Sequence, residues 1–193
     1  MCPQNSNFID DIVRNLFWND HNFYRSVVAR NAPVGGEKVV QRPASQMNQI
    51  RNYGCALEYA AYLTASRCSA TDDSASSPAN NENQYIARNL NAAPLDAAKQ
   101  AINSWFGEIQ SNKMPQGPGQ KNLYTSSLGI PHGAMFIWET HTTIGCAIAK
   151  CSTFFKVVCY YSPELANMEN RQIYKMGPTC ARCKVCNDGL CNP

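Results

Sequence analysis

His132 is the residue of this chain whose type and setting best suit acid–base or metal chemistry. It lies in the stretch 129–161, where a short apolar run precedes two segments that alternate as β-strands do. An imidazole can serve as a general base or as a metal ligand. His132 and His141 are nine residues apart, so they do not share a helix face at i and i+4, and neither His-Glu-x-x-His nor Gly-x-Ser-x-Gly occurs. Known hydrolase motifs are therefore absent, although serines elsewhere could meet His132 in space.

The ten cysteines offer a second kind of chemistry. Between Cys180 and Cys191 they follow the spacing Cys-x2-Cys-x2-Cys-x4-Cys, which could hold zinc or an iron–sulfur cluster. Cys2, Cys55 and Cys68 have no metal-ligand spacing. An even, high count spread from end to end is typical of disulfides formed in an oxidising compartment. We therefore predict a disulfide framework and a secreted protein.

Length and charge narrow the function classes further. The 193 residues fit one domain with a sizeable core and a small appendage. The net charge is only +3 and no basic cluster with interleaved aromatics occurs, which argues against a nucleic-acid partner. No apolar run approaches the ~20 residues of a membrane span. The N-terminus, Met1-Cys2-Pro3, carries no apolar leader, as expected of a mature secreted chain.

Apolar periodicity predicts three helices and two strands that position these residues. His21 lies at the edge of the apolar stripe of the first helix, where a hydrogen-bonded core histidine is more common than a ligand. Polar or Gly/Pro-containing stretches predict three long loops. The predicted helices are Phe8–Val28, Leu57–Cys68 and Pro94–Ile109, the strands lie near Ile144–Ile148 and Phe155–Cys159, and the loops are Asn31–Arg42, Ser69–Asn81 and Ser111–Tyr124.

Several motifs together resemble the CAP (SCP/TAPS) superfamily. His132-x5-Trp138, followed eight residues later by Cys146, is similar to its first signature, although Pro131 stands where the signature has Gly. The resemblance covers nearly the whole chain. It is greatest to the activation-associated secreted proteins, or venom allergen-like proteins, of parasitic nematodes. The other matching motifs are His21-Asn22-x-x-Arg25, Trp105-Phe106-Gly107-Glu108, Cys159-Tyr160-Tyr161-Ser162-Pro163 with Asn167-Met168, and the cysteine-rich tail.

The resemblance implies an α/β fold, a three-layer α-β-α sandwich with a central cleft. It implies a CAP domain over residues 1–176 and a disulfide-rich, hinge-like tail over residues 177–193. It also implies structural roles for His21, Arg25, Trp105 and Trp138. The disulfides that it favours are Cys68–Cys146 and Cys151–Cys159, with the remaining pairs formed among Cys2, Cys55, Cys180, Cys183, Cys186 and Cys191.

The resemblance places Glu82, Glu108 and His132 in the cleft. Such clefts commonly hold a second histidine shortly after the cysteine that corresponds to Cys68, but here the run is Ser-Ala-Thr-Asp-Asp over 69–73. A catalytic zinc needs about three protein ligands. One histidine and two glutamates, joined by Asp72, imply at most a weak divalent-metal site, and no cofactor is required.

The function implied is that of a secreted, non-enzymatic protein of a parasitic nematode that binds host proteins or lipids and modulates host immunity. Two alternatives remain open: a metal-dependent hydrolase that uses the cleft, and a sterol or lipid carrier that uses apolar grooves between helices. The resemblance leaves a homodimer open and does not identify the host partner.

Overall fold

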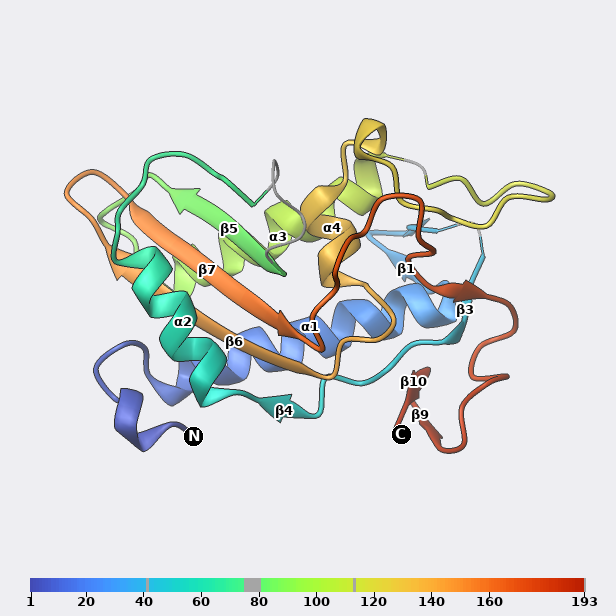
Figure 1. The fold of residues 1–193 in the computed structure, drawn as a ribbon, viewed down its shortest axis with the longest axis horizontal. Helices are drawn as coiled ribbons and strands as arrows, with labels where there is room; N and C mark the ends of the chain where they lie inside the picture. The colour runs from blue at the N-terminus through green and yellow to red at the C-terminus, as the bar shows by residue number, and fades with distance from the viewer. Residues whose placement is uncertain (41, 75–80, 113, 193) are drawn as a thin grey trace.

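A four-stranded sheet forms the middle of the computed structural model, which describes residues 1–40, 42–74, 81–112 and 114–192 (Figure 1). The strand order is β4-β6-β7-β5. β6 pairs antiparallel with β7, and β7 antiparallel with β5, while β4 runs parallel to β6. The strands are β4 (Asn52–Tyr53), β5 (Glu82–Ala87), β6 (Thr143–Lys150) and β7 (Phe155–Ser162).

Helices cover both faces of this sheet. α2 (Cys55–Ala65) packs alone on one face, against β6 and β7, and lies in front of them in Figure 1. α1 (Asp11–Arg30), α3 (Pro94–Ser111) and α4 (Pro131–Phe136) pack on the other face and on one another. The predicted α-β-α layering is confirmed. The short elements are η1 (Pro3–Asn5), β1 (Pro33–Val34), β2 (Glu37–Lys38), β3 (Ala44–Gln46), η3 (Ser126–Leu128), β8 (Lys175–Met176), β9 (Cys186–Asn187) and β10 (Leu190–Cys191).

Two helix boundaries differ from the predictions because of local capping. The carboxylate of Asp10 accepts a hydrogen bond from the Val13 amide at 2.8 Å, so α1 begins after Asp10 and not at Phe8. α2 begins two residues earlier than predicted. It ends before Cys68, whose φ of 51° lies in the left-handed region and takes the chain out of the helix.

The contact between α2 and the sheet depends on Gly145 in β6. A Cβ atom at this position would lie 2.3 Å from the Glu58 amide nitrogen and 2.5 Å from the Gly54 carbonyl oxygen. Both are backbone atoms at the start of α2, which cannot move aside without shifting the helix. A glycine is therefore required for α2 to begin directly on the strand.

The predicted pairing of the central cysteines is wrong. Cys146 and Cys159 are direct partners in the β6–β7 register, their Cα atoms are 4.1 Å apart, and they form a cross-strand disulfide. Cys151 follows β6 in the hairpin turn and bonds to Cys68, just beyond α2. All ten cysteines lie in the described residues and are paired, the others as Cys2–Cys55, Cys180–Cys186 and Cys183–Cys191.

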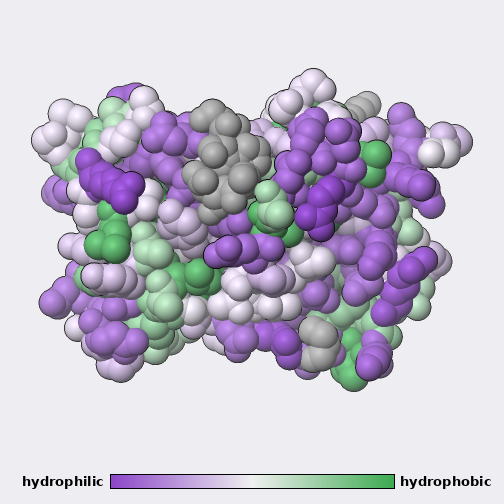
Figure 2. Space-filling model, in the orientation of Figure 1, coloured by the Kyte–Doolittle hydropathy of each residue, from purple (hydrophilic) through white to green (hydrophobic). Residues whose placement is uncertain are grey.

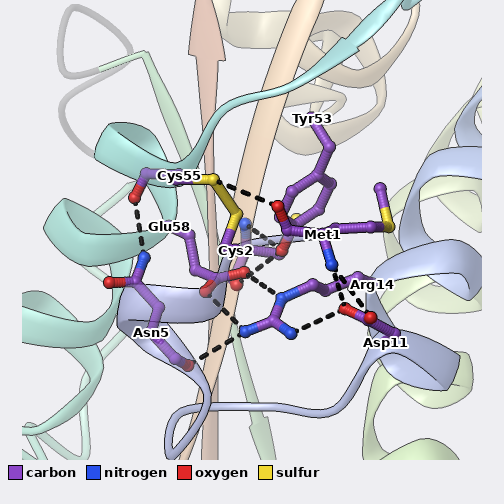
Figure 3. The surroundings of a disulfide bond; sticks show 9 residues. Met1, Cys2, Asn5, Asp11, Arg14, Tyr53, Cys55 and Glu58 are labelled. Carbon is purple, nitrogen blue, oxygen red and sulfur yellow. Dashed lines mark hydrogen bonds and ion pairs between the residues drawn. A yellow bond between two sulfur atoms is a disulfide. The ribbon is translucent and has the colours of Figure 1, made fainter.

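The N-terminal segment is fixed to α1 and α2 by one disulfide and a buried ion pair (Figure 3). Cys2 bonds to Cys55 at the first position of α2. The Arg14 guanidinium donates to both carboxylate oxygens of Glu58, at 2.8 and 2.9 Å, and also to Asp11. The Glu58 side chain is fully buried, so this pairing satisfies a charge that would otherwise be costly.

The C-terminal tail packs against the other end of α1 and against the segment around β3. The Thr179 hydroxyl donates to the Ala29 carbonyl at 2.9 Å, and the Cys191 amide donates to the Met47 carbonyl at 2.7 Å. Its two disulfides hold β9 and β10 together. The domain boundary at residue 176 stays a prediction, and part of the predicted Ser69–Asn81 loop lies outside the described residues. No helix in the described ranges has the length and apolar character needed to cross a membrane.

Candidate functional site

His132 occupies the second position of α4, where its ring contacts α3 and the loop that follows α2. Its Nδ1 lies 2.6 Å from Glu108 Oε1, and its Nε2 lies 3.0 Å from Asp72 Oδ2 and 3.1 Å from Ser74 Oγ. We call these four residues the His132 cluster. Ionised carboxylates only accept hydrogen bonds, so both ring nitrogens carry hydrogens and the ring is an imidazolium.

The carboxylates fix the charge of this ring. Burial alone lowers the pKa of His132, but the hydrogen bonds and charges of Asp72 and Glu108 outweigh burial and raise the pKa to about 9. Burial also raises the pKa of Asp72, while hydrogen bonds from His132 and Ser74 lower it more, so its net pKa is lowered. The two shifts describe the same ion pair, which is intact at neutral pH.

Close packing between α3 and α4 sets the position of His132. The Gly133 amide donates to Glu108 Oε2 at 2.8 Å, so Glu108 holds both the ring and the backbone of α4. A Cβ atom at Gly133 would lie 2.7 Å from Ile109 Cγ1 and 3.0 Å from the Trp105 carbonyl oxygen. The residue after His132 must therefore be a glycine for the two helices to approach this closely.

Ser74, His132 and Glu108 lie in the order of a serine–histidine–carboxylate triad, but their hydrogen bonds run the other way. The Ser74 hydroxyl donates to Asp72 Oδ1 at 2.6 Å and accepts from the Gln84 amide at 3.1 Å. His132 Nε2, being protonated, donates toward Ser74. A nucleophilic serine needs a histidine nitrogen that accepts its proton. The resting geometry therefore does not activate Ser74.

Glu82, the third predicted cleft residue, faces a different hollow. Its carboxylate accepts from the Gln84 side-chain amide at 3.0 Å, and it lines a pocket with Lys156 and Tyr160. Glu82 pairs with Tyr160 across β5 and β7, so both side chains are on the α2 face of the sheet. The structure thus brings His132 and Glu108 together and places Glu82 elsewhere.

The donor set of the His132 cluster does not fit a catalytic zinc. Glu108 and Asp72 contact opposite nitrogens of the ring, so at most one of them can join Nε2 at a single ion. That leaves two strong ligands where about three are needed. Within the described residues, the one group of His, Cys, Asp and Glu side chains with three converging ligand atoms is Cys180, Cys183 and Cys186, all in disulfides.

Two further histidines lie in the core on the α1 side of the sheet. His21 Nδ1 contacts the Phe17 carbonyl at 2.6 Å and its Nε2 contacts the Tyr161 hydroxyl at 3.0 Å, while its ring stacks on Phe136. His141 Nδ1 contacts the Met135 carbonyl at 3.1 Å. Burial first, and then the charge of Arg25, lower the pKa of both histidines to about 3. Both are neutral core residues.

The remaining structural residues named from the sequence are all buried. Arg25 is fully buried, and its guanidinium donates to backbone carbonyls, among them those of Phe136 and Trp138, both at 3.0 Å. Trp105 donates from Nε1 to the Gln84 carbonyl at 3.0 Å and joins α3 to β5. Trp138 lies two residues beyond α4 and not within it.

Ser74 is the member of the cluster that sequence reasoning missed. Its only local signal is Asp72 two residues earlier, because an aspartate commonly accepts from the amide two residues on. Asp72 does so here, with Oδ1 3.1 Å from the Ser74 nitrogen. Such turns are common in loops, so the signal does not identify a site.

The comparisons with known proteins agree with this arrangement. Residues 18–161 match the family described as the cysteine-rich secretory protein (CAP) family. Hookworm platelet inhibitor 1 of Ancylostoma caninum is 34% identical over 98% of this chain and 82% of its own length. Ancylostoma secreted protein of the same organism is 31% identical, and the match spans 99% of this chain but 46% of that protein. The crystal structure of NaASP2 with Zn²⁺ covers all of both chains at 29% identity, with a TM-score of 0.82.

Proposed function

Since the chain belongs to the CAP family and is a secreted protein related to the hookworm Ancylostoma secreted proteins, we propose that it is a metal-independent binding protein. It acts on a host protein through its surface and modulates a host response, without catalysis. The observation that carries this proposal is His132 held between Asp72 and Glu108.

The protonation of His132 supports a non-enzymatic role. A general base needs a free lone pair, and a metal ligand needs a neutral imidazole. Both ring nitrogens of His132 instead donate to carboxylates. The ring exposes 12% of its side chain, so the ion pair is also partly shielded from water. The cluster thus joins α3, α4 and the loop after α2 and stabilises the cleft wall.

The relatives support a host protein as the partner. One relative with 34% identity is named a platelet inhibitor, which concerns that protein. We extend it here as a proposal: this chain binds a protein on the surface of host platelets or leukocytes. The net charge of +3 favours no strongly charged partner.

Cell binding and hydrolysis, measured side by side, test this proposal. The protein is treated with a chelator, dialysed and fluorescently labelled, and its binding to platelets and leukocytes is measured by flow cytometry. Peptide and ester substrates are assayed with and without added Zn²⁺. We expect saturable binding that His132→Gln retains, and no hydrolysis. Zinc-dependent hydrolysis that His132→Gln abolishes would instead establish the metal-dependent hydrolase.

An apolar groove favours lipid carriage as a second candidate function. It has a volume of about 300 Å³ and lies between the segment before α1, the start of α3 and the β6–β7 hairpin. Lys150 stands at this groove and could face a lipid headgroup or carboxylate. The apolar lining comes from Phe8, Ile9, Val13, Ile148 and Phe155. Mass spectrometry of an organic extract of the purified protein tests this candidate: a stoichiometric lipid supports it, and a lipid-free extract after incubation with fatty acids and sterols contradicts it.

A further inference from the structure

A polar hollow of about 190 Å³ lies on the α2 face of the sheet, beyond the C-terminal end of that helix. α2 ends at Ala65 and covers β6 and β7, and in Figure 1 it leaves β5 uncovered on this side. The hollow is lined by residues from three elements: Thr64 and Arg67 from α2 and its end, Glu82 and Gln84 from β5, and Lys156 and Tyr160 from β7.

The side chains in this hollow are unusually polar for a covered sheet face. Lys156 is 1% exposed, Gln84 3% and Glu82 5%. On the same face of β7, Val158 packs with Ala61 in a small apolar cluster under α2. The face therefore changes from apolar to polar within one residue pair of the strand. Burying charged and amide groups costs free energy, so a row of them needs a reason beyond stability.

The groups in the hollow offer both hydrogen-bond donors and acceptors. Lys156 Nζ donates to the Thr71 carbonyl at 2.6 Å and has two further hydrogens. The Gln84 amide and the Glu82 carboxylate lie side by side at 3.0 Å. The hydroxyls of Thr64 and Tyr160 are 3.1 Å apart. A ligand that fits this lining must itself both donate and accept.

The charges around the hollow cancel. Glu82 and Asp73 supply two negative charges, and Lys156 and Arg67 supply two positive charges. A strongly anionic or cationic ligand would face an unfavourable partner on one wall. A neutral ligand with several hydroxyl groups can instead donate to the carboxylates and accept from the ammonium and guanidinium groups. The volume is below the ~300–1,000 Å³ of pockets for drug-sized ligands, which points to a single ring.

We propose that this polar hollow binds one neutral sugar residue of a host glycan. The inference rests on the proposed binding function, because it names the ligand chemistry of one pocket of a binding protein. It is independent of the charge of His132, whose side chain lies outside this lining. Arg67 is exposed at the hollow and can contact the next part of a glycan.

Nuclear magnetic resonance on the ¹⁵N-labelled full chain tests the proposal. The probes are the methyl glycosides of glucose, galactose, mannose and N-acetylglucosamine, each at about 20 mM, which detects a Kd in the millimolar range. We expect at least one glycoside to shift amide signals of β5, β7 and the end of α2. Arg67→Ala and the shape-matched Glu82→Gln should each weaken binding at least fivefold, while the exposed, distant Arg88→Ala should leave it unchanged.

Three results would overturn the inference. The first is that none of the glycosides shifts these signals. The second is that a glycoside binds but Arg67→Ala and Arg88→Ala behave alike. The third is that a zwitterion such as L-glutamine, or an anion such as sulfate, binds in the hollow while the neutral glycosides do not. If binding to host cells persists in any of these cases, the proposed binding function stands and only the sugar is excluded.

Discussion

The His132 cluster and the core around His21 and His141 use the same residue type in opposite charge states. His132 contacts two carboxylates, which raise its pKa to about 9. His21 and His141 contact backbone carbonyls beside the cation Arg25, and burial lowers their pKa to about 3. The difference shows that the partners a fold supplies, and not the residue type, decide whether a histidine is a charged crosslink or a neutral core residue.

One side chain joins these two regions. The Asn83 amide donates to the His132 carbonyl and to the Tyr161 hydroxyl, both at 3.0 Å. The Tyr161 hydroxyl in turn donates to His21 Nε2, which agrees with a neutral His21. Changes on either side can therefore be compared within one connected hydrogen-bond network.

Removing the cation of the core region should have the largest effect. Arg25→Met leaves several buried carbonyls, including those of Phe136, Trp138 and Asn48, without a donor. We expect the free energy of unfolding to fall by about 3–5 kcal/mol, as for other disrupted buried charge networks. Urea denaturation measures it, with the exposed Arg88→Met as control. A loss equal to that of the control would show that the carbonyls find other donors.

The two regions should lose stability at opposite ends of the pH scale. The pKa of His132 is raised by folding, from 6.5 to about 9, so its contribution is complete below pH 6.5 and is lost as the pH rises toward 9. The pKa values of His21 and His141 are lowered from 6.5, so their contributions are complete above pH 6.5 and are lost as the pH falls.

We therefore expect maximal stability near pH 6.5, with a loss of about 2–3 kcal/mol on the alkaline side from His132. Denaturant unfolding at a series of pH values measures both limbs. His132→Gln should flatten the alkaline limb and leave the acidic limb in place. An alkaline limb of unchanged slope in this variant would mean that the loss comes from other groups.

A second imidazole should turn the His132 cluster into a metal site. Isothermal titration of the unmodified protein should find no tight zinc binding. Asp72→His removes the carboxylate that holds Nε2 and adds a neutral nitrogen ligand, so we expect zinc affinity to rise at least tenfold, about 1.4 kcal/mol. Adding His132→Ala to this variant should abolish the gain. Tight zinc binding by the unmodified chain would contradict the charged state assigned to His132.

The hydrogen bond between the two regions should have the smallest effect. Tyr161→Phe removes the hydroxyl between His21 and Asn83 but keeps the ring that stacks on His141. We expect a loss of about 1–2 kcal/mol of unfolding free energy. The pKa of His132, followed by its ring proton resonances, should not move. A shifted His132 pKa would show that the core region sets the charge of the cluster through Asn83.

Local sequence patterns were sufficient for the elements and for one contact of the site. The apolar periodicity of residues 94–109 predicts α3, and the motifs around Glu108 and His132 place both residues on packed helices, α3 and α4. The cysteine count predicts a disulfide framework, because spacing and compartment are properties of the chain alone. Those features depend on residues that are close together in sequence or on composition.

Tertiary structure alone decided which residues meet across long separations. The β6–β7 register pairs Cys146 with Cys159 and leaves Cys151 to Cys68, a choice that spacing cannot make. The parity of β5 turns Glu82 to the α2 face and away from His132, since a shift of one residue exchanges the two faces of a strand. The path of the loop after α2 brings Asp72 to His132 and thereby sets its charge. Register, strand parity and loop path arise from packing of the whole chain, which a local pattern does not encode.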